Sequence, residues 1–389
     1  MKKKKKIIRI TTIPGSLGVL LDGQLKFMSQ FYEIIGISSA GTPPFSLDDV
    51  AKKEEVKVIP VEMSRRITFL KDIAGVFKLG YIFIKERPDI VHTHTPKAGL
   101  LGMLAAYITR VPLRMHTVAG MPLLETTGSK RRLLDLIEKL TYFCATHVYP
   151  NSFGLKEIII KNHYAPESKI KVIGHGSSNG IDTSFFDPQI YSAADRETLS
   201  NSIGVPNGDF VFSFVGRLVK DKGINELIEA FKKICSTHSN ISLVLVGGSE
   251  PELDPLLPET VAEIESNKKI FTVGWQKDVR PFLAISNAFV FPSYREGFPN
   301  SVLQASSMGL PCIVSDINGC NEIIQHEGNG LIVPPKNTDA LFEGMVSLIN
   351  GNQAIQLDSD QIRKQIKDQY ERKVIMTKIL EEYRSLLSQ

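Results

Sequence analysis

Two basic residues follow a predicted strand in the second half of the chain. Arg217 and Lys222 lie in VGRLVKDKG, between the apolar run DFVFSFV and a helix expected to begin near Gly223. Arginine offers a planar fork of donors to phosphate, lysine adds a point charge, and a helix amino terminus attracts anions. The pattern predicts a phosphate site, with two surface charges at a helix start as the alternative.

A carboxylate lies in a second loop of the same kind. Phe291–Gly309 reads FPSYREGFPNSVLQASSMG, which predicts a strand end, a Gly/Pro loop carrying Glu296, and a short helix capped by Asn300 or Ser301. Backbone amides at such a helix start favour an anion. A carboxylate beside an anion site is costly unless it binds neutral donors such as sugar hydroxyls. The alternative is an ordinary strand-to-helix turn with a solvated Glu296.

Histidines cluster near predicted strand ends in the first half. His92 and His94 in HTHTPKAG share one strand face, and His116 lies on a later strand. No cysteine or carboxylate completes a metal set, so we expect no metal. A histidine that donates to a substrate oxygen and a histidine satisfied at a strand end both remain open.

Two further loops offer backbone and ring contacts. PGSLG, over Pro14–Gly18, is either a ligand-binding loop or a plain turn, and VGWQKDV carries Trp275, which could flank a planar base. The chain lacks both GxGxxG with its acidic ribose partner and GxxxxGK[ST], which disfavours a nicotinamide enzyme and a P-loop ATPase. Asp358 and Asp360 precede a predicted helix, where capping explains them better than metal binding.

The elements that position these residues alternate between strands and helices. This alternation predicts an α/β protein with two Rossmann-like parallel-sheet domains facing across a cleft, with ligands at the carboxyl ends of the strands. We expect an N-terminal domain over 1–184 and a C-terminal domain over 185–367, with a last helix, about 368–389, packing back on the first domain. The predicted strands are Ile7–Ile13, Glu33–Ser39, Val56–Glu62, Asp89–His94, Leu113–Gly120, Ala145–Ser152, one within Ser168–Asp182, Asp209–Leu218, Ile241–Gly248, Ile270–Trp275, Ala288–Ser293, Leu310–Asp316 and Gly328–Pro335.

Helical periodicity fills the gaps between the strands. One predicted helix, capped by Ser129, places Leu133, Leu134, Ile137 and Leu140 on a common apolar face. The other main predicted helices are Leu20–Phe31, Ile67–Pro88, Ala98–Val111 and Lys222–Cys235, followed by two C-terminal helices.

Bulk composition fits a soluble globular protein of two domains. The 389 residues are 42% hydrophobic with a net charge of only +4, which argues against nucleic-acid binding. The run Lys2–Lys6 is either a solvated tail or a weak attraction to anionic lipid. Four cysteines without CxxC spacing indicate a reduced, cytoplasmic protein. No stretch is apolar and long enough to span a bilayer.

Taken together, VGRLVKDKG and REGFPNSVLQA resemble the family-4 retaining glycosyltransferases (GT4) of GT-B fold. VGW, PSYREGFP, GLPCIVSD and GLIVPP agree in order and spacing, and VEMSRRITFLKD and VHTHTPKAGLLGMLAA are similar to the bacterial PglA-like branch. The resemblance implies transfer, without a metal or other cofactor, of a HexNAc-type sugar from a nucleotide donor, expected to be UDP-linked. The implied acceptor is a polyprenyl-diphosphate-linked sugar for capsule, O-antigen or another glycan.

The resemblance also implies roles for individual residues. Arg217, Lys222 and Glu296 become the catalytic set: the two cations hold the donor diphosphate and Glu296 the donor sugar. The implied donor-binding residues are Gly18, His94, Trp275, Gln276, Gly297, Phe298, Pro299, Asn300, Ser301 and Gln304. The implied acceptor-side residues are Gly15, Lys97, His116, Gly176 and Asn179.

Two positions depart from the family pattern. Gln304 stands where a second glutamate usually binds ribose hydroxyls, and a neutral amide loses a charge-assisted bond of about twice the strength. Ala119 stands where a histidine often precedes Gly120, so His94 or a backbone group would take that task. These departures keep open a non-catalytic sugar-nucleotide-binding subunit, and a GT-B epimerase is the other alternative.

A lipid-linked acceptor implies a peripheral protein on the inner face of the cytoplasmic membrane. The apolar stretch Met121–Leu124 beside Lys130, Arg131 and Arg132 is the predicted contact with anionic lipid, and a solvated helix start is the alternative.

Overall fold

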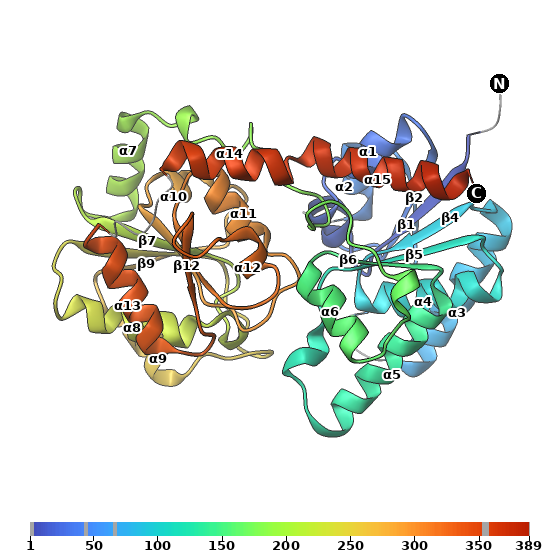
Figure 1. The fold of residues 1–389 in the computed structure, drawn as a ribbon, viewed down its shortest axis with the longest axis horizontal. Coiled ribbons are helices and arrows are strands. Elements are labelled where there is room, and N and C mark those ends of the chain that lie inside the picture. The colour runs from blue at the N-terminus through green and yellow to red at the C-terminus, as the bar shows by residue number, and fades with distance from the viewer. Residues whose placement is uncertain (1–3, 43–45, 65–67, 352–357, 389) are drawn as a thin grey trace. The chain divides into compact units, whose positions relative to one another are not determined.

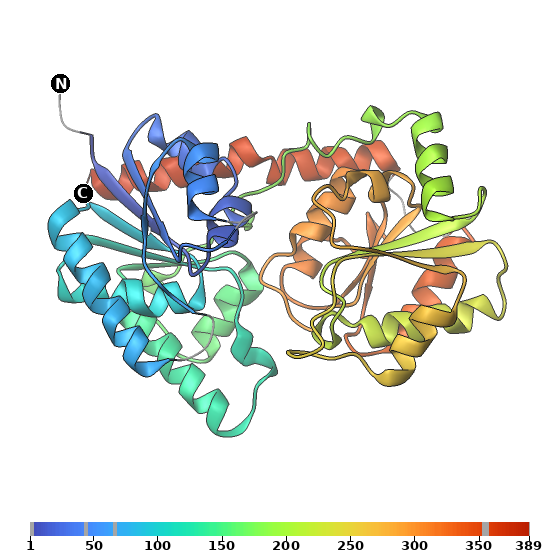
Figure 2. The ribbon, with the colours of Figure 1, turned by 180° about the vertical axis from the view of Figure 1, so that it is seen from behind.

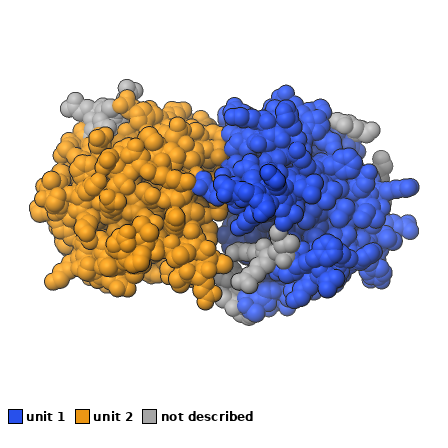
Figure 3. All heavy atoms as spheres, turned by 90° about the horizontal axis from the view of Figure 1, so that it is seen from below, with its two compact units in different colours: residues 1–180, 372–389 blue, residues 181–371 orange. Residues whose placement is uncertain are grey.

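The chain folds into two compact units. The computed structural model describes residues 4–388 apart from 43–45, 65–67 and 352–357. Unit 1 comprises Met1–Gly180 and Arg372–Gln389, and unit 2 comprises Ile181–Glu371 (Figure 3). The two arginines of VEMSRRITFLKD and the first lysines of the Lys2–Lys6 run lie outside the described residues.

Unit 1 is built on a parallel sheet, which among the described residues has six strands in the order β3-β2-β1-β4-β5-β6 (Figure 1). Because β1 lies between β2 and β4, the chain changes winding direction there. The strands are β1 (Lys6–Ile10), β2 (Glu33–Ser38), β3 (Lys57–Pro60), β4 (Ile90–Thr93), β5 (Leu113–Val118) and β6 (His147–Pro150).

Helices cover both faces of this sheet because its strands are apolar on both sides. Ile7 and Ile8, which point to opposite faces of β1, belong to different buried clusters. One face packs on η1 (Ser16–Leu20), α1 (Gln24–Ser29), α2 (Leu47–Glu54) and α15 (Arg372–Leu387). The other packs on α3 (Phe69–Glu86), α4 (Pro96–Ile108), η2 (Pro122–Glu125), α5 (Gly128–Cys144) and α6 (Phe153–Lys161), and the single turn η3 (Glu167–Lys169) follows.

Unit 2 repeats the scheme, with strand order β12-β11-β10-β7-β8-β9 among its described residues. The strands are β7 (Phe210–Val215), β8 (Ile241–Val246), β9 (Ile270–Gly274), β10 (Ala288–Phe291), β11 (Cys312–Ser315) and β12 (Gly330–Val333). The helices are η4 (Pro188–Ile190), α7 (Ala193–Ile203), η5 (Lys220–Lys222), α8 (Ile224–Cys235), α9 (Pro258–Ser266), α10 (Arg280–Ala284), α11 (Asn300–Ser307), α12 (Cys320–Ile323), α13 (Thr338–Ile349) and α14 (Ser359–Tyr370). Two parallel, doubly wound sheets confirm the predicted fold class.

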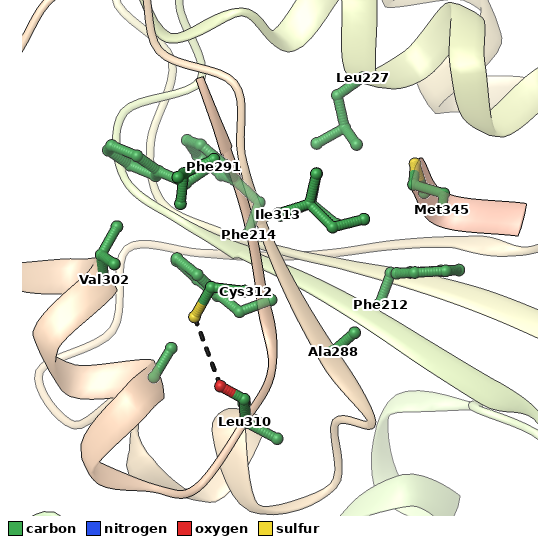
Figure 4. Packing of buried hydrophobic residues seen from close by; sticks show 14 of the residues in the cluster. Phe212, Phe214, Leu227, Ala288, Phe291, Val302, Leu310, Cys312, Ile313 and Met345 are labelled. Atoms are coloured by element: carbon green, nitrogen blue, oxygen red, sulfur yellow. Dashed lines mark hydrogen bonds between the residues drawn. The ribbon is translucent and has the colours of Figure 1, made fainter. Parts of the chain in front are cut away.

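The core of unit 2 joins side chains from strands far apart in sequence. Phe214 on β7 and Phe291 on β10 stack with ring centroids 5.8 Å apart (Figure 4). Leu227 on α8 and Val302 on α11 belong to the same buried cluster. This packing fixes the ends of β7 and β10, from which the candidate site loops leave.

Several sequence predictions fail locally. The helix expected over Leu20–Phe31 is interrupted because Gly23 has φ +71°, a left-handed conformation that ends a right-handed helix. The turn expected at Pro14–Gly18 is partly the helical turn η1. The strand expected within Ser168–Asp182 contributes only two isolated bridges, Ile170 with Val148 and Ile181 with Glu371.

The apolar face predicted for α5 is only partly buried: Leu134 packs against the core of unit 1, and Ile137 is half-buried. Leu133 and Leu140 are 45% and 39% exposed, whereas Glu138 and Tyr142 are buried. The helix begins after Thr127 without a side-chain cap, so Ser129 does not cap it. By contrast, Asp358 does cap α14, as predicted.

Candidate active site

The candidate site of unit 2 lies where its strand order reverses. β7 pairs with β10 on one side and β8 on the other, so the loops that follow β7 and β10 leave the same edge of the sheet side by side. Ligands of open parallel sheets bind at such a reversal. The first loop carries Arg217 and Lys222, and the second carries Glu296.

Lys222 and Glu296 form an ion pair between these loops. The Lys222 ammonium contacts Glu296 Oε1, and the two side chains are 16% and 15% exposed, respectively. Ser293 Oγ donates to the same carboxylate oxygen at 3.0 Å, and the Asn318 amide donates to the Glu296 carbonyl. The lysine also lies 5.7 Å from the centre of the Phe291 ring. Glu296 is therefore fixed at both its side chain and its backbone.

The two loops are locked together through their backbones. The Tyr294 amide donates to the Asp221 carbonyl at 2.9 Å, and Arg295 pairs with the Asp221 carboxylate at 2.7 Å. Gly223 has φ +70°, and a Cβ built there would lie 2.0 Å from the Pro292 carbonyl oxygen. Only glycine permits this close approach.

Arg217 lies at the exposed side of the site. Its guanidinium pairs with Glu250 at 2.5 Å, and its side chain is 46% exposed. Glu250 comes from the loop after β8, the next strand along the sheet. Each cation thus has its own carboxylate, which removes the repulsion expected between two unpaired cations. An exposed pair of this kind contributes only about 0–1 kcal/mol, so an anionic ligand can replace it.

The predicted donor-binding stretch continues into α11. Pro299, and neither Asn300 nor Ser301, is the N-cap, and no side chain caps the helix, so that prediction was wrong. Phe298 is buried against Tyr370, with ring centroids 5.3 Å apart. Gly297 precedes it in the same loop, and Gln304 is half-buried one turn into α11. The first amides of α11 therefore lack a side-chain acceptor of their own.

Trp275 and Gln276 follow β9 at the far side of the same sheet. The Trp275 side chain is 60% exposed, and the Gln276 amide donates to the Val273 carbonyl at 2.6 Å. β9 is separated from β7 by β8. These two residues therefore flank the site two strands away from Lys222.

Three histidines of unit 1, His92, His94 and His116, are buried and hydrogen-bonded. His92 bonds Tyr383 at 2.6 Å and Thr117 at 2.8 Å, and His116 bonds Thr93 at 2.8 Å. Burial lowers the pKa of His116 to about 4 and holds the pKa values of His92 and His94 well below their usual value. The rings are therefore neutral at pH 7. Within the described residues, no three His, Cys, Asp or Glu side chains gather as a metal-binding group.

A buried arginine organises the end of β1 in unit 1. Arg9 is fully buried, its Nε donates to His94 Nε2 at 3.0 Å, and its Nη2 donates to the side-chain oxygen Oε1 of Gln24. Gln24 in turn bonds Asn179 at 3.0 Å, and Asn179 bonds the Asp22 carbonyl at 2.8 Å. The sequence reasoning missed this network. The signal was an arginine inside the apolar strand IIRI.

The other predicted residues of unit 1 lie after β1, after β4 and in the segment that follows η3. Lys97 pairs with Asp72 at 2.5 Å and is almost buried. A Cβ on Gly18 would lie 2.9 Å from Val50 Cγ2, whereas one on Gly15 would meet no atom within 4 Å. Gly176 has φ +98° in the loop that carries Asn179. The β1 and β4 loops meet at the strand reversal of this unit.

Family comparisons match both halves of the chain. Residues 35–176 match the model described as "Glycosyl transferase 4-like domain", and residues 195–369 match "Glycosyl transferases group 1". The crystal structure of Anabaena Alr3699/HepE in complex with UDP superposes with a TM-score of 0.80 at 19% identity, over 98% of this chain and 100% of that one.

Three named relatives match at higher identity. The capsular polysaccharide biosynthesis glycosyltransferase CapM of Staphylococcus aureus is 33% identical over 389 residues, covering 100% of this chain and 99% of the relative. The UDP-Gal:alpha-D-GlcNAc-diphosphoundecaprenol alpha-1,3-galactosyltransferase of Escherichia coli is 34% identical, with coverages of 73% and 72%. The N,N'-diacetylbacillosaminyl-diphospho-undecaprenol alpha-1,3-N-acetylgalactosaminyltransferase of Campylobacter jejuni is 26% identical, with coverages of 84% and 85%. The chain belongs to the family-4 glycosyltransferases of GT-B fold and is a glycosyltransferase.

Proposed function

We propose that the protein transfers a HexNAc-type sugar from a UDP-linked donor to a polyprenyl-diphosphate-linked sugar in bacterial surface polysaccharide or glycan synthesis. The observation that carries this proposal is the Lys222–Glu296 pair at the strand reversal of unit 2, with Arg217 beside it. The Escherichia coli and Campylobacter jejuni relatives are named for sugar transfer to diphosphoundecaprenol-linked acceptors. Family membership favours transfer over epimerisation.

In this proposal unit 2 binds the donor. Arg217, Lys222 and the amides at Gly297–Ser301 stabilise the diphosphate as it leaves, and such preorganised electrostatic stabilisation is often the largest catalytic contribution. Glu296 accepts hydrogen bonds from the donor sugar, Gln304 faces the ribose, and Trp275 and Gln276 flank the base. The reaction retains the anomeric configuration and proceeds without a metal.

Unit 1 in turn binds the acceptor. Gly15, Lys97, His116, Gly176 and Asn179 lie in or beside the loops at the carboxyl ends of its strands. Gly18 and His94 belong to the same unit, and we assign them to the donor sugar by the family resemblance. Because His116 and His94 are neutral, they would act as hydrogen-bond partners rather than as cations.

A lipid-linked acceptor requires the enzyme to work at a membrane surface, and we place it on the cytoplasmic face. None of the described helices is long and apolar enough to cross a bilayer. Among the residues that the structure describes, the cysteines are free thiols, which fits a reducing compartment. They are Cys144, Cys235, Cys312 and Cys320.

A ligand-stabilisation screen tests the donor assignment. UDP and UDP-HexNAc should raise the melting temperature of the wild-type protein more than GDP-sugars do, equally with and without EDTA. A ligand at 100 times its Kd stabilises the fold by about 2.7 kcal/mol. The variant Arg217→Ala should lose most of this shift, whereas Arg196→Ala, which removes an exposed arginine of α7 in the same unit, should keep it. Stabilisation by GDP-sugars alone, or an Arg217→Ala response equal to wild type, would contradict the assignment.

A further inference from the structure

Helix α3 carries apolar side chains on two opposite sides. Leu79 and Phe83 are buried against the sheet side of unit 1. On the opposite side, Leu70 is 81% exposed and Phe77 is 75% exposed. Successive residues of an α-helix are about 100° apart around the helix axis. The exposed apolar residues therefore cover an arc of roughly 120°, on the side of α3 opposite to the buried residues. The full exposed set is Phe69, Leu70, Ile73, Phe77, Tyr81 and Ile84.

The same arrangement recurs on the neighbouring helices. α4 packs between α3 and α5, and the three lie side by side over one face of the sheet (Figures 1 and 2). On α5, Leu136 and Phe143 are 64% and 63% exposed, and Phe143 contacts Tyr107 of α4 with ring centroids 5.7 Å apart. We call the sides of α3, α4 and α5 that turn away from the sheet the outer helix face. Several large apolar side chains exposed on neighbouring helices are typical of an interaction site.

Positive charge borders this apolar surface. Lys71, Lys78 and Lys85 repeat every seven residues along one flank of α3, and all three are exposed. No carboxylate of the described chain lies within 4.0 Å of any of them. The acidic residues of α3 are occupied elsewhere: Asp72 pairs with Lys97 at 2.5 Å, and Glu86 with Lys6 at 2.7 Å.

The α5 helix adds charge of the same sign. Arg132 and Lys139 are exposed beside its apolar stripe, and Asp135 is paired with Arg131 at 2.9 Å. An exposed apolar stripe flanked by basic residues is the pattern of a helix that lies in a membrane interface, with the charges directed at anionic head groups. Five charged residues on α3 exclude a membrane span for that helix.

We propose that the outer helix face binds the anionic surface of a lipid bilayer. The biological role of this surface rests on the proposed function. The proposal puts the membrane contact along the length of α3 and α5. It replaces the contact predicted at Met121–Leu124, because Met121 and Leu123 are buried, at 2% and 1% exposure. Insertion of Phe77 and Tyr81 would hold unit 1 at the head-group level, where a polyprenyl diphosphate presents its saccharide.

Vesicle flotation tests the proposal with the full-length protein. Wild-type protein should float with phosphatidylcholine vesicles containing roughly one third phosphatidylglycerol, and less with pure phosphatidylcholine. The variant Phe77→Gln/Tyr81→Gln should lose binding at any salt concentration. Lys71→Gln/Lys78→Gln/Lys85→Gln should bind roughly 10- to 100-fold more weakly, since each lysine near an anionic surface contributes several-fold. Controls are Leu253→Gln, an apolar residue 67% exposed in unit 2, and Lys268→Gln/Lys364→Gln/Lys367→Gln, three exposed lysines of unit 2.

Three results would overturn the proposal. The first is wild-type protein that does not float, and the second is α3 variants that float like wild type. The third is a wild-type dimer in sedimentation that Phe77→Gln/Tyr81→Gln converts to monomer, which would assign the face to a second copy. The Phe77→Gln/Tyr81→Gln variant should still transfer sugar to a short-chain, detergent-soluble acceptor. A wild-type protein that floats but transfers no sugar would contradict the proposed function alone.

Discussion

At the scale of single residues, the site depends on how Glu296 is held. Lys222 neutralises its charge, Ser293 donates to the same oxygen, and the Asn318 amide fixes its carbonyl. In the proposed function Lys222 turns to the donor phosphate, and Ser293 and Asn318 remain to hold Glu296. Lys222 also lies near the Phe291 ring, so a partly desolvated cation is available next to the carboxylate. In the proposed function, Lys222 binds the donor diphosphate and the neighbouring Glu296 accepts hydrogen bonds from the hydroxyls of the donor sugar.

Gln304→Glu tests the ribose contact at the same scale. A charged acceptor makes a hydrogen bond to a hydroxyl about twice as strong as a neutral one, so we expect UDP to bind roughly 5- to 10-fold more tightly. Isothermal titration of UDP measures this, with Gln304→Ala expected to bind more weakly than wild type. Gln189→Glu, at an exposed position of unit 2, is the matched control and should leave the affinity unchanged. Equal affinity in Gln304→Glu and Gln189→Glu would place residue 304 away from the nucleotide.

At the scale of elements, close backbone approach brings the catalytic loops together. Gly223 ends the turn η5 in the left-handed region and begins α8, against the Pro292 carbonyl of the β10 loop. Gly319, with φ +78°, approaches the Gly297 carbonyl in the same way from the β11 side. Through these contacts, the positions of β7, β10 and β11 determine where the side chains of the site lie.

Gly223→Ala should destabilise unit 2. Alanine would be strained at φ +70° and its Cβ would clash with the Pro292 carbonyl, so we expect a loss of about 2–4 kcal/mol in unfolding free energy. Urea denaturation measures the change. Gly248→Ala is the control, because a Cβ there meets no atom within 4 Å, and it should stay within about 0.5 kcal/mol of wild type. A Gly223→Ala protein as stable as Gly248→Ala would refute the loop-locking argument.

The buried side of α5 predicts a pH dependence. Burial raises the pKa of Glu138 from the usual 4.5 to about 7. Between these values the native state holds a proton that the unfolded state has lost, so this group's contribution to stability falls as pH rises from about 4.5 to 7. Glu138→Gln removes the effect, and its stability relative to wild type should increase by roughly 3 kcal/mol over that range.

Urea unfolding at pH 5 and at pH 8 measures this difference. Changes in the histidine network of unit 1 affect both proteins equally and cancel. Glu157→Gln, at an exposed position of α6, should show no pH-dependent difference from wild type. If the unfolding free energies of wild type and Glu138→Gln differ by the same amount at both pH values, Glu138 is ionised in the native state.

At the scale of the whole molecule, the sequence predicts the alternation of strands and helices and the family, but only part of the packing. Arg217 and Lys222 were identified from their own loop, whereas the contact of Lys222 with Glu296 depends on β7 pairing with β10, more than 70 residues later. Apolar periodicity finds both stripes of α3 and α5 but cannot tell which stripe the sheet covers. On α5 the buried side includes Glu138 and Tyr142 together with the partly buried Leu134, whereas Leu133, Leu136 and Leu140 are exposed. Arg9 was overlooked because buried cations depend on distant partners such as Gln24.

The central claim is that the strand reversal of unit 2 carries out sugar transfer, and one measurement tests it most directly. Purified wild type, Arg217→Ala and Arg196→Ala are assayed with UDP-HexNAc and a polyprenyl-diphosphate-linked monosaccharide in the presence of EDTA. We predict a product with the donor's anomeric configuration, a kcat for Arg217→Ala on the order of 10²–10³-fold below wild type, and unchanged turnover for Arg196→Ala. An Arg217→Ala enzyme as fast as wild type, or a product of inverted configuration, would contradict the account.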